Sequence, residues 1–136
     1  MNLYGLNWAK NQIPLIKKAI VFESEKSVLK YQSYFGIENN IAVACCGSNI
    51  SARQMQLLLD HGAEEIVIAF DKQYQELNTQ ESKQWSTKLT KIHNKYKNIC
   101  KISFLWDKGT ALGYKDAPID QGANVFLYLF KERILL

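Results

Sequence analysis

Two short apolar runs, both rich in β-branched residues, constrain the fold more than any other feature of this sequence. Residues 19–23 have the sequence AIVFE and residues 66–71 have the sequence IVIAFD, so Glu23 and Asp71 each close one run. Continuous apolar runs of this length are typical of buried parallel strands. In open α/β sheets, ligands bind in the crevice outside the carboxyl ends of such strands. We therefore expect Glu23 and Asp71 to converge on one acidic site of the kind that binds divalent metals and phosphates.

Strand-like and helical patterns alternate along the rest of the chain. Ser51 and Gln54 form a capping-box pattern, which marks the start of one helix. The patterns predict strands at 19–23, 41–45, 66–71 and 101–106, and helices over 24–36, after Ser51, around 85–96 and over 121–131. Such alternation predicts an α/β domain with a central parallel sheet of about four strands, flanked by helices.

Length and composition favour one compact domain. The chain has 136 residues, of which 47% are hydrophobic, and its net charge is +4. That size suits a single core, and the mild positive charge fits a polyanionic partner without requiring one. Three cysteines without metal-ligand spacing, together with the lack of an apolar run of about 18 residues, predict a cytoplasmic protein that does not enter membranes.

Four motifs resemble the Toprim domain, and among Toprim proteins they are most similar to the polymerase core of DnaG-like primases. The motifs are Leu3-Tyr4-Gly5-Leu6, residues 21–27 (VFESEKS), Gly47-Ser48-x-Ile50-Ser51 and Lys115-Asp116-x-Pro118. The resemblance implies a Toprim-like (Rossmann-like) domain over residues 19–136. Residues 1–18 would be the tail of the preceding primase subdomain, or a connecting helix. The chain would then be a piece of a longer phage or bacterial primase.

The resemblance also assigns roles to acidic residues. It implies that Glu23 and Asp71 are catalytic and that they hold Mg²⁺ or Mn²⁺ together with Asp116. Asp107, Asp120 and Gln73 are additional candidates for the metal site. Gln73 stands where the family has the second acid of its D-x-D motif, and Ser24 stands where it usually has glycine. Gln73 offers a hard cation only a neutral oxygen.

Further candidates would contact nucleotides or nucleic acid, namely Lys26, Lys72, Gly47 and Ser48. Lys26, Lys72 and Lys115 are also candidates for offsetting the repulsion among the clustered carboxylates. The resemblance implies primer synthesis from nucleoside triphosphates on a single-stranded DNA template. The implied partners are the N-terminal catalytic subdomain, the zinc-binding module and a replicative helicase.

Other interpretations stay open from the sequence. A small Toprim nuclease would use the same acids for hydrolysis, with Glu23 as the general acid, and a non-catalytic scaffold would explain Gln73. Asp120 is expected to be the N-cap of the last helix. The lysines at 88, 91, 95, 97 and 101 favour a solvated helix face over a nucleic-acid contact. The tryptophans are expected to pack in the core or at interfaces.

Overall fold

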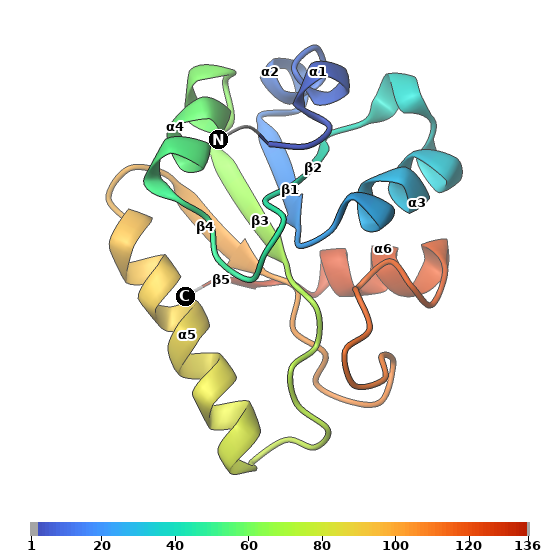
Figure 1. The fold of residues 1–136 in the computed structure, drawn as a ribbon, viewed down its shortest axis with the longest axis vertical. Helices are drawn as coiled ribbons and strands as arrows, with labels where there is room; N and C mark the ends of the chain where they lie inside the picture. Colours follow the sequence, from blue (N-terminus) through green and yellow to red (C-terminus); the bar gives the residue numbers. More distant parts are fainter. Residues whose placement is uncertain (1–2, 136) are drawn as a thin grey trace.

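The computed structural model describes residues 3–135, which form a central sheet between layers of helices (Figure 1). The strands are β1 (Lys18–Phe22), β2 (Ala42–Ala44), β3 (Glu65–Ala69), β4 (Lys101–Phe104) and β5 (Ile134–Leu135). They lie in the order β2-β1-β3-β4-β5; the first four are parallel, and β5 pairs antiparallel with β4. The predicted α/β fold with a central parallel sheet is confirmed, and β5 is a fifth strand that the sequence pattern does not signal.

The helices form two layers, with α3 and α6 on one side of the sheet and α4 and α5 on the other (Figure 1). The helices are α1 (Leu6–Ala9), α2 (Ile13–Ile16), α3 (Glu25–Phe35), the 3-10 helix η1 (Ile37–Asn39), α4 (Ala52–Asp60), α5 (Gln80–Tyr96) and α6 (Ala123–Lys131). On the first side, the ring of Phe22 in β1 packs against Tyr31 and Phe126, with centroids 6.3 and 5.9 Å apart. No helix among residues 3–135 combines the length and the apolar character that a membrane span requires.

Local sequence signals explain where α4 and α5 begin. The backbone N–H of Gln54 donates to the Ser51 hydroxyl, and the Gln54 side chain accepts from the Ser51 N–H, which confirms the predicted capping box. Thr79 and Ser82 form a second box of the same kind at the start of α5. Each box satisfies backbone donors that the first helical turn leaves unpaired. The start of each helix is therefore determined by residues that are three positions apart in the sequence.

The segment before β1 packs onto the same core as the rest of the chain. Tyr4 forms an antiparallel bridge with Ala44 of β2, through N···O contacts of 3.0 and 2.9 Å. Ala9 of α1 and Ile13 of α2 are completely buried. Residues 3–17, which belong to the segment 1–18 expected to be a subdomain tail or a connecting helix, thus cover one edge of this sheet, and Lys18 is already part of β1.

Candidate functional site

Glu23 and Asp71 meet at the carboxyl edge of the sheet, as the sequence predicts. Glu23 directly follows β1, and Asp71 lies two residues beyond β3, the parallel neighbour of β1. Phe22 and Ala69 are partners in the strand register, so the two chain segments leave the sheet side by side. The backbone N–H of Asp71 donates to Oε2 of Glu23 at 2.8 Å. The Glu23 carboxylate is therefore fixed to the backbone that carries Asp71.

The pKa values of both carboxyl groups are raised. Partial burial raises the pKa of Glu23, although the Asp71 N–H and the charge of Lys88 oppose this shift. Burial also raises the pKa of Asp71 to about 7, and the negative charges of Glu23, Asp120 and Asp116 add to this effect. The ammonium of Lys26 acts in the opposite direction on the pKa of Asp71. Asp71 can therefore exchange a proton near neutral pH.

One oxygen of Asp71 is buried without a hydrogen-bond partner. Atom Oδ1 is shielded from solvent, and no donor in the described chain reaches it. A buried acceptor without a donor is costly, and a cation or a donor from a ligand would remove that cost. Within residues 3–135, no three His, Cys, Asp or Glu side chains are grouped closely enough to hold a metal. The residues fit an ion such as Mg²⁺, which often takes one or two carboxylates and completes its shell with water and substrate oxygens.

Asp116 lies near enough to raise the pKa of Asp71, but its carboxylate is engaged within its own loop. Its Oδ2 accepts hydrogen bonds from the Gly113 N–H at 2.7 Å and from the Gln121 amide at 2.8 Å. Its backbone carbonyl accepts from the Lys72 N–H at 2.8 Å. The loop bonds therefore hold Asp116 beside Asp71 while occupying one of its two carboxylate oxygens.

Asp120 is not the N-cap of the last helix, because α6 begins at Ala123 and its N-cap is Gly122. The carboxylate of Asp120 instead accepts from the Ala117 N–H at 2.9 Å and pairs with Lys30 at 3.2 Å. Its charge still contributes to the raised pKa of Asp71. Asp120 is therefore held in a turn, and it affects the site only through the action of its negative charge on Asp71.

Lys72 and Asp107 form a buried ion pair, which corrects the roles expected for both. The Lys72 ammonium donates to Asp107 Oδ2 at 2.8 Å and to the carbonyls of Gly109 and Leu112 at 3.2 and 3.0 Å. All three of its protons thus have acceptors, and none is left for a nucleotide phosphate or for the Glu23–Asp71 pair. Asp107 also accepts the N–H groups of Gly109 and Leu112 and is 4% exposed, so it is not available to a metal.

A hollow of about 400 Å³ opens beside Glu23, and we call it the Glu23 hollow. Its lining residues are Glu23, Ser48, Gln73, Glu81, Gln84, Trp85, Lys88 and Tyr114. Gln73 and Ser48 therefore lie beside Glu23, while their expected contacts to metal and nucleotide stay predictions. The neighbouring Gly47 is exposed, and nothing lies within 4 Å of the position where a Cβ would stand. The backbone there leaves room for a ligand to approach closely.

Lys88, for which the sequence favours a solvated helix face, is a further functional candidate. Its ammonium lies 2.6 Å from the Ser48 hydroxyl and 5.3 Å from the centre of the Trp85 ring, and its charge lowers the pKa of Glu23. The spacing of Trp85 and Lys88, three residues apart on a helix, places them on one face. That spacing is visible in the sequence, but only the position of α5 shows that this face meets Glu23.

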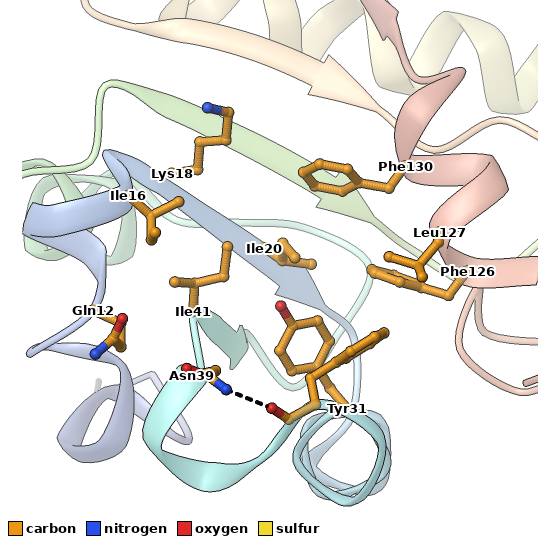
Figure 2. Close-up of a pocket in the computed structure, with 11 residues that line it drawn as sticks. Gln12, Ile16, Lys18, Ile20, Tyr31, Asn39, Ile41, Phe126, Leu127 and Phe130 are labelled. Atoms are coloured by element: carbon orange, nitrogen blue, oxygen red, sulfur yellow. Dashed lines mark hydrogen bonds between the residues drawn. The ribbon is translucent and has the colours of Figure 1, made fainter. Parts of the chain in front are cut away.

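A larger hollow of about 460 Å³ lies elsewhere and does not belong to this site. Figure 2 shows its mainly apolar walls, to which Ile20, Tyr31 and Phe126 contribute. Ile16 at the end of α2 and Lys18 at the start of β1 also line it, which places it toward the amino end of the strand. Among the described residues that line it, none carries a carboxylate. The acidic groups, rather than the larger volume, therefore locate the candidate site.

Comparison with known sequences gives one curated relative. No family model matches the chain. The chain is 41% identical over 141 residues to the SPbeta prophage-derived uncharacterized protein YorJ of Bacillus subtilis (strain 168). The match covers 98% of this chain and 37% of that protein. The chain thus spans little more than a third of the length of this relative.

Comparison with solved structures reveals the fold of bacterial primases. The zinc-binding and RNA polymerase domains of the Aquifex aeolicus primase match with a TM-score of 0.69 at 21% identity, over 98% of this chain and 30% of that one. A DNA primase domain from Pseudomonas aeruginosa gives 0.68 at 18% identity, over 98% of this chain and 39% of that one. A DnaG primase catalytic domain bound to single-stranded DNA gives 0.65 at 17% identity, over the same shares. Over nearly its whole length, the chain therefore has the α/β fold of the DnaG-type primase domains.

Proposed function

We propose that this chain is the Toprim catalytic domain of a phage-type DNA primase, which extends RNA primers on single-stranded DNA by metal-dependent nucleotidyl transfer. The observation that carries the proposal is the contact between Glu23 and the Asp71 backbone, at the carboxyl edge of a primase-like sheet. The similar primase catalytic domain was solved with bound single-stranded DNA, which supports single-stranded DNA as the proposed template. The prophage-derived relative supports a phage origin.

The reaction joins the 3′-hydroxyl oxygen of the primer to the α-phosphorus of a nucleoside triphosphate, and pyrophosphate leaves. A bound Mg²⁺ or Mn²⁺ would neutralise phosphate charge and favour ionisation of the hydroxyl. Asp71 offers its unpartnered Oδ1 to the cation, and Glu23, held by the Asp71 N–H, contributes a second carboxylate. The raised pKa of Glu23 also suits it to accept the proton that the hydroxyl releases.

Other residues of the site bind and orient the phosphates. Lys88 and Ser48 lie on one wall of the Glu23 hollow and offer a cation and a hydroxyl to the triphosphate. Lys26 adds positive charge on the Asp71 side. Because the chain spans only 30–40% of the primase chains it resembles, we assign template capture to an N-terminal catalytic subdomain and a zinc-binding module, and helicase contact to a further partner.

The test compares Asp71→Asn with Asp60→Asn, the same chemical change at an exposed residue of α4. Primer synthesis is assayed on single-stranded DNA with ribonucleoside triphosphates, in the protein with its flanking domains, and Mn²⁺ binding is measured by electron paramagnetic resonance. Asp71→Asn should abolish synthesis and weaken Mn²⁺ binding, whereas Asp60→Asn should change neither. Wild-type synthesis in Asp71→Asn would refute the proposal, and absence of Mn²⁺ binding in the wild type would favour a non-catalytic scaffold.

A nuclease of the same fold is the second candidate, because Glu23 and Asp71 would serve metal-dependent hydrolysis with the same two carboxyl groups. In that reaction Glu23, as the general acid, would protonate the oxygen that leaves when water attacks the phosphodiester. Incubation with end-labelled RNA and DNA in Mg²⁺ or Mn²⁺ separates the two reactions. Shortened products that disappear in Asp71→Asn would identify a nuclease, and products extended by nucleotides would identify a primase.

A further inference from the structure

Three lysines on one face of α5 line a groove that adjoins the Glu23 hollow. Lys88, Lys91 and Lys95 are spaced by three and four residues, which places them on the same face of the helix. They line a depression of about 360 Å³ together with Asn49, Ile92 and Tyr96, and we call it the lysine groove. Lys91 and Lys95 are exposed, as the predicted solvated helix face requires, and the structure adds that they border a hollow.

The lysine groove and the Glu23 hollow share a wall. Lys88 lines both depressions, and the adjacent turn contributes Ser48 to the hollow and Asn49 to the groove. A ligand that follows the lysines along α5 is therefore led to the acidic residues at the sheet edge.

The positive charge of the groove is not neutralised by the protein. Among residues 3–135, none of the ion pairs includes Lys88, Lys91 or Lys95. Two of these ammonium groups are held above aromatic rings, Lys88 over Trp85 and Lys95 over Tyr96, each 5.3 Å from the ring centre. Trp85 and Tyr96 are themselves buried, so they hold the ammonium groups in place and leave backbone phosphates, rather than bases, as the partners of this row.

The length of the row suits a strand of nucleotides. At a rise of about 1.5 Å per residue, Lys88 and Lys95 lie about 10.5 Å apart along α5. A stacked strand carries one phosphate per about 3.4 Å, so the three lysines span about three nucleotides. We propose that the lysine groove holds the sugar-phosphate backbone of a single-stranded nucleic acid and leads one end of it to the Glu23 hollow. The inference deepens the proposed function and rests on it.

The test measures binding without chemistry. Fluorescence anisotropy of a labelled oligothymidylate is recorded in a chelator at several salt concentrations for Lys91→Gln/Lys95→Gln. The control is Lys83→Gln/Lys97→Gln, which removes the same charge from exposed positions of the same region outside the groove. Each phosphate contact of a single strand contributes about 0.7 to the slope of log affinity against log salt. The groove variant should bind about tenfold more weakly at low salt and should flatten this slope by about 1.4.

The control pair should retain both the affinity and the slope of the wild type, and circular dichroism should show that both variants are folded. Equal losses of affinity in the two double variants would mean that only net charge matters, and they would overturn the proposal that the strand binds in the lysine groove. Loss of affinity in Lys91→Gln/Lys95→Gln, combined with unchanged primer synthesis in Asp71→Asn, would refute the proposed function. The proposal that the lysine groove binds a single strand would then still hold.

A second measurement tests where the strand ends. Cys46 is exposed and lies two residues from Ser48, so it can trap an oligonucleotide that carries a thiol-reactive group at one end. Trapping should favour one end over the other, fall in Lys91→Gln/Lys95→Gln and vanish in Cys46→Ser. Equal trapping of both ends, or trapping that does not depend on Lys91 and Lys95, would overturn the path to the Glu23 hollow.

Discussion

The ammonium of Lys72 lies 2.8 Å from the carboxylate of Asp107, and the two side chains are only 4% and 3% exposed. Lys72 follows Asp71 directly, and its own backbone pairs with the loop that carries Asp116: its N–H donates to the Asp116 carbonyl, and its carbonyl accepts from Lys115 at 2.7 Å. The buried pair thus fastens the chain beyond β3 to the loop beyond β4. The pair thereby positions Asp71 and Asp116 without contacting the carboxylate of either residue.

Replacement of Lys72 by methionine should strongly destabilise the fold, because it leaves the charge of Asp107 buried without its partner. Burial alone would raise the pKa of Asp107, but the Lys72 ammonium and two backbone N–H groups outweigh it and lower that pKa. We expect Lys72→Met to reduce the free energy of unfolding by about 3–5 kcal/mol in urea denaturation. Lys83→Met, at an exposed position of α5, should change it by less than about 0.5 kcal/mol. A small effect of Lys72→Met would show that Asp107 relaxes into solvent.

Asp71 should make the stability of the metal-free protein fall as the pH rises. An aspartate in the unfolded chain has a pKa of about 4, whereas burial and neighbouring acids raise that of Asp71 to about 7. Between these values the folded state binds more protons than the unfolded state, so stability decreases from about pH 4 to about pH 7. In a chelator, Asp71→Asn should be more stable than the wild type by about 2 kcal/mol above pH 7, and by little at pH 4.

Thermal unfolding of both proteins across this pH range provides the measurement. Asp60→Asn serves as the control, and its pH dependence should follow that of the wild type. Parallel curves for the wild type and Asp71→Asn would show that the folded protein solvates Asp71 better than its burial suggests.

Replacement of Gln73 by aspartate should tighten metal binding. Gln73 lines the Glu23 hollow, where an added carboxylate offers a charged oxygen to a hard cation. We expect Gln73→Asp to lower the dissociation constant of Mn²⁺ about tenfold, which corresponds to about 1.4 kcal/mol. Calorimetric titration measures it, with Gln84→Glu as a control that adds the same charge to the same hollow from α5. Equal gains in the two variants would mean that position 73 has no special relation to the metal.

Loss of the Arg133 side chain should destabilise the edge of the sheet formed by β4 and β5. Its guanidinium contacts both oxygens of the buried Glu65, at 2.6 and 3.2 Å, and the Ser103 hydroxyl donates to the same carboxylate at 2.7 Å. Arg133→Met should cost about 3 kcal/mol in urea denaturation, because Glu65 then keeps only a neutral donor. The double variant Arg133→Met/Glu65→Gln should recover part of that loss; no recovery would place the effect in β5 itself.

The sequence predicts those parts of the site that depend on neighbouring residues along the chain. Glu23 and Asp71 are predictable because a strand's carboxyl end is visible as an apolar run that stops at an acid. The Ser51 capping box is predictable because its partners are three residues apart.

Other parts depend on contacts between distant segments. Lys72 and Asp107 are 35 residues apart, and their sequence context does not distinguish an internal pair from two site residues. Lys88 meets Ser48 and Glu23 only because α5 lies over the carboxyl edge of the sheet. The two-residue strand β5 is too short for any periodicity. Asp120 is a good N-cap by residue type, but the turn to Ala117 uses its carboxylate first.

Both open edges of the sheet are shielded by short antiparallel segments. Tyr4 pairs with Ala44 along the outer side of β2, and β5 pairs with Ser103 and Phe104 along the outer side of β4. An uncovered edge presents free N–H and C=O groups to which a strand of another molecule can add. The outermost partner on each side is thus a single bridge or a strand of two residues, so the edge that another strand could extend is short, while the acids at the carboxyl edge stay open to ligands.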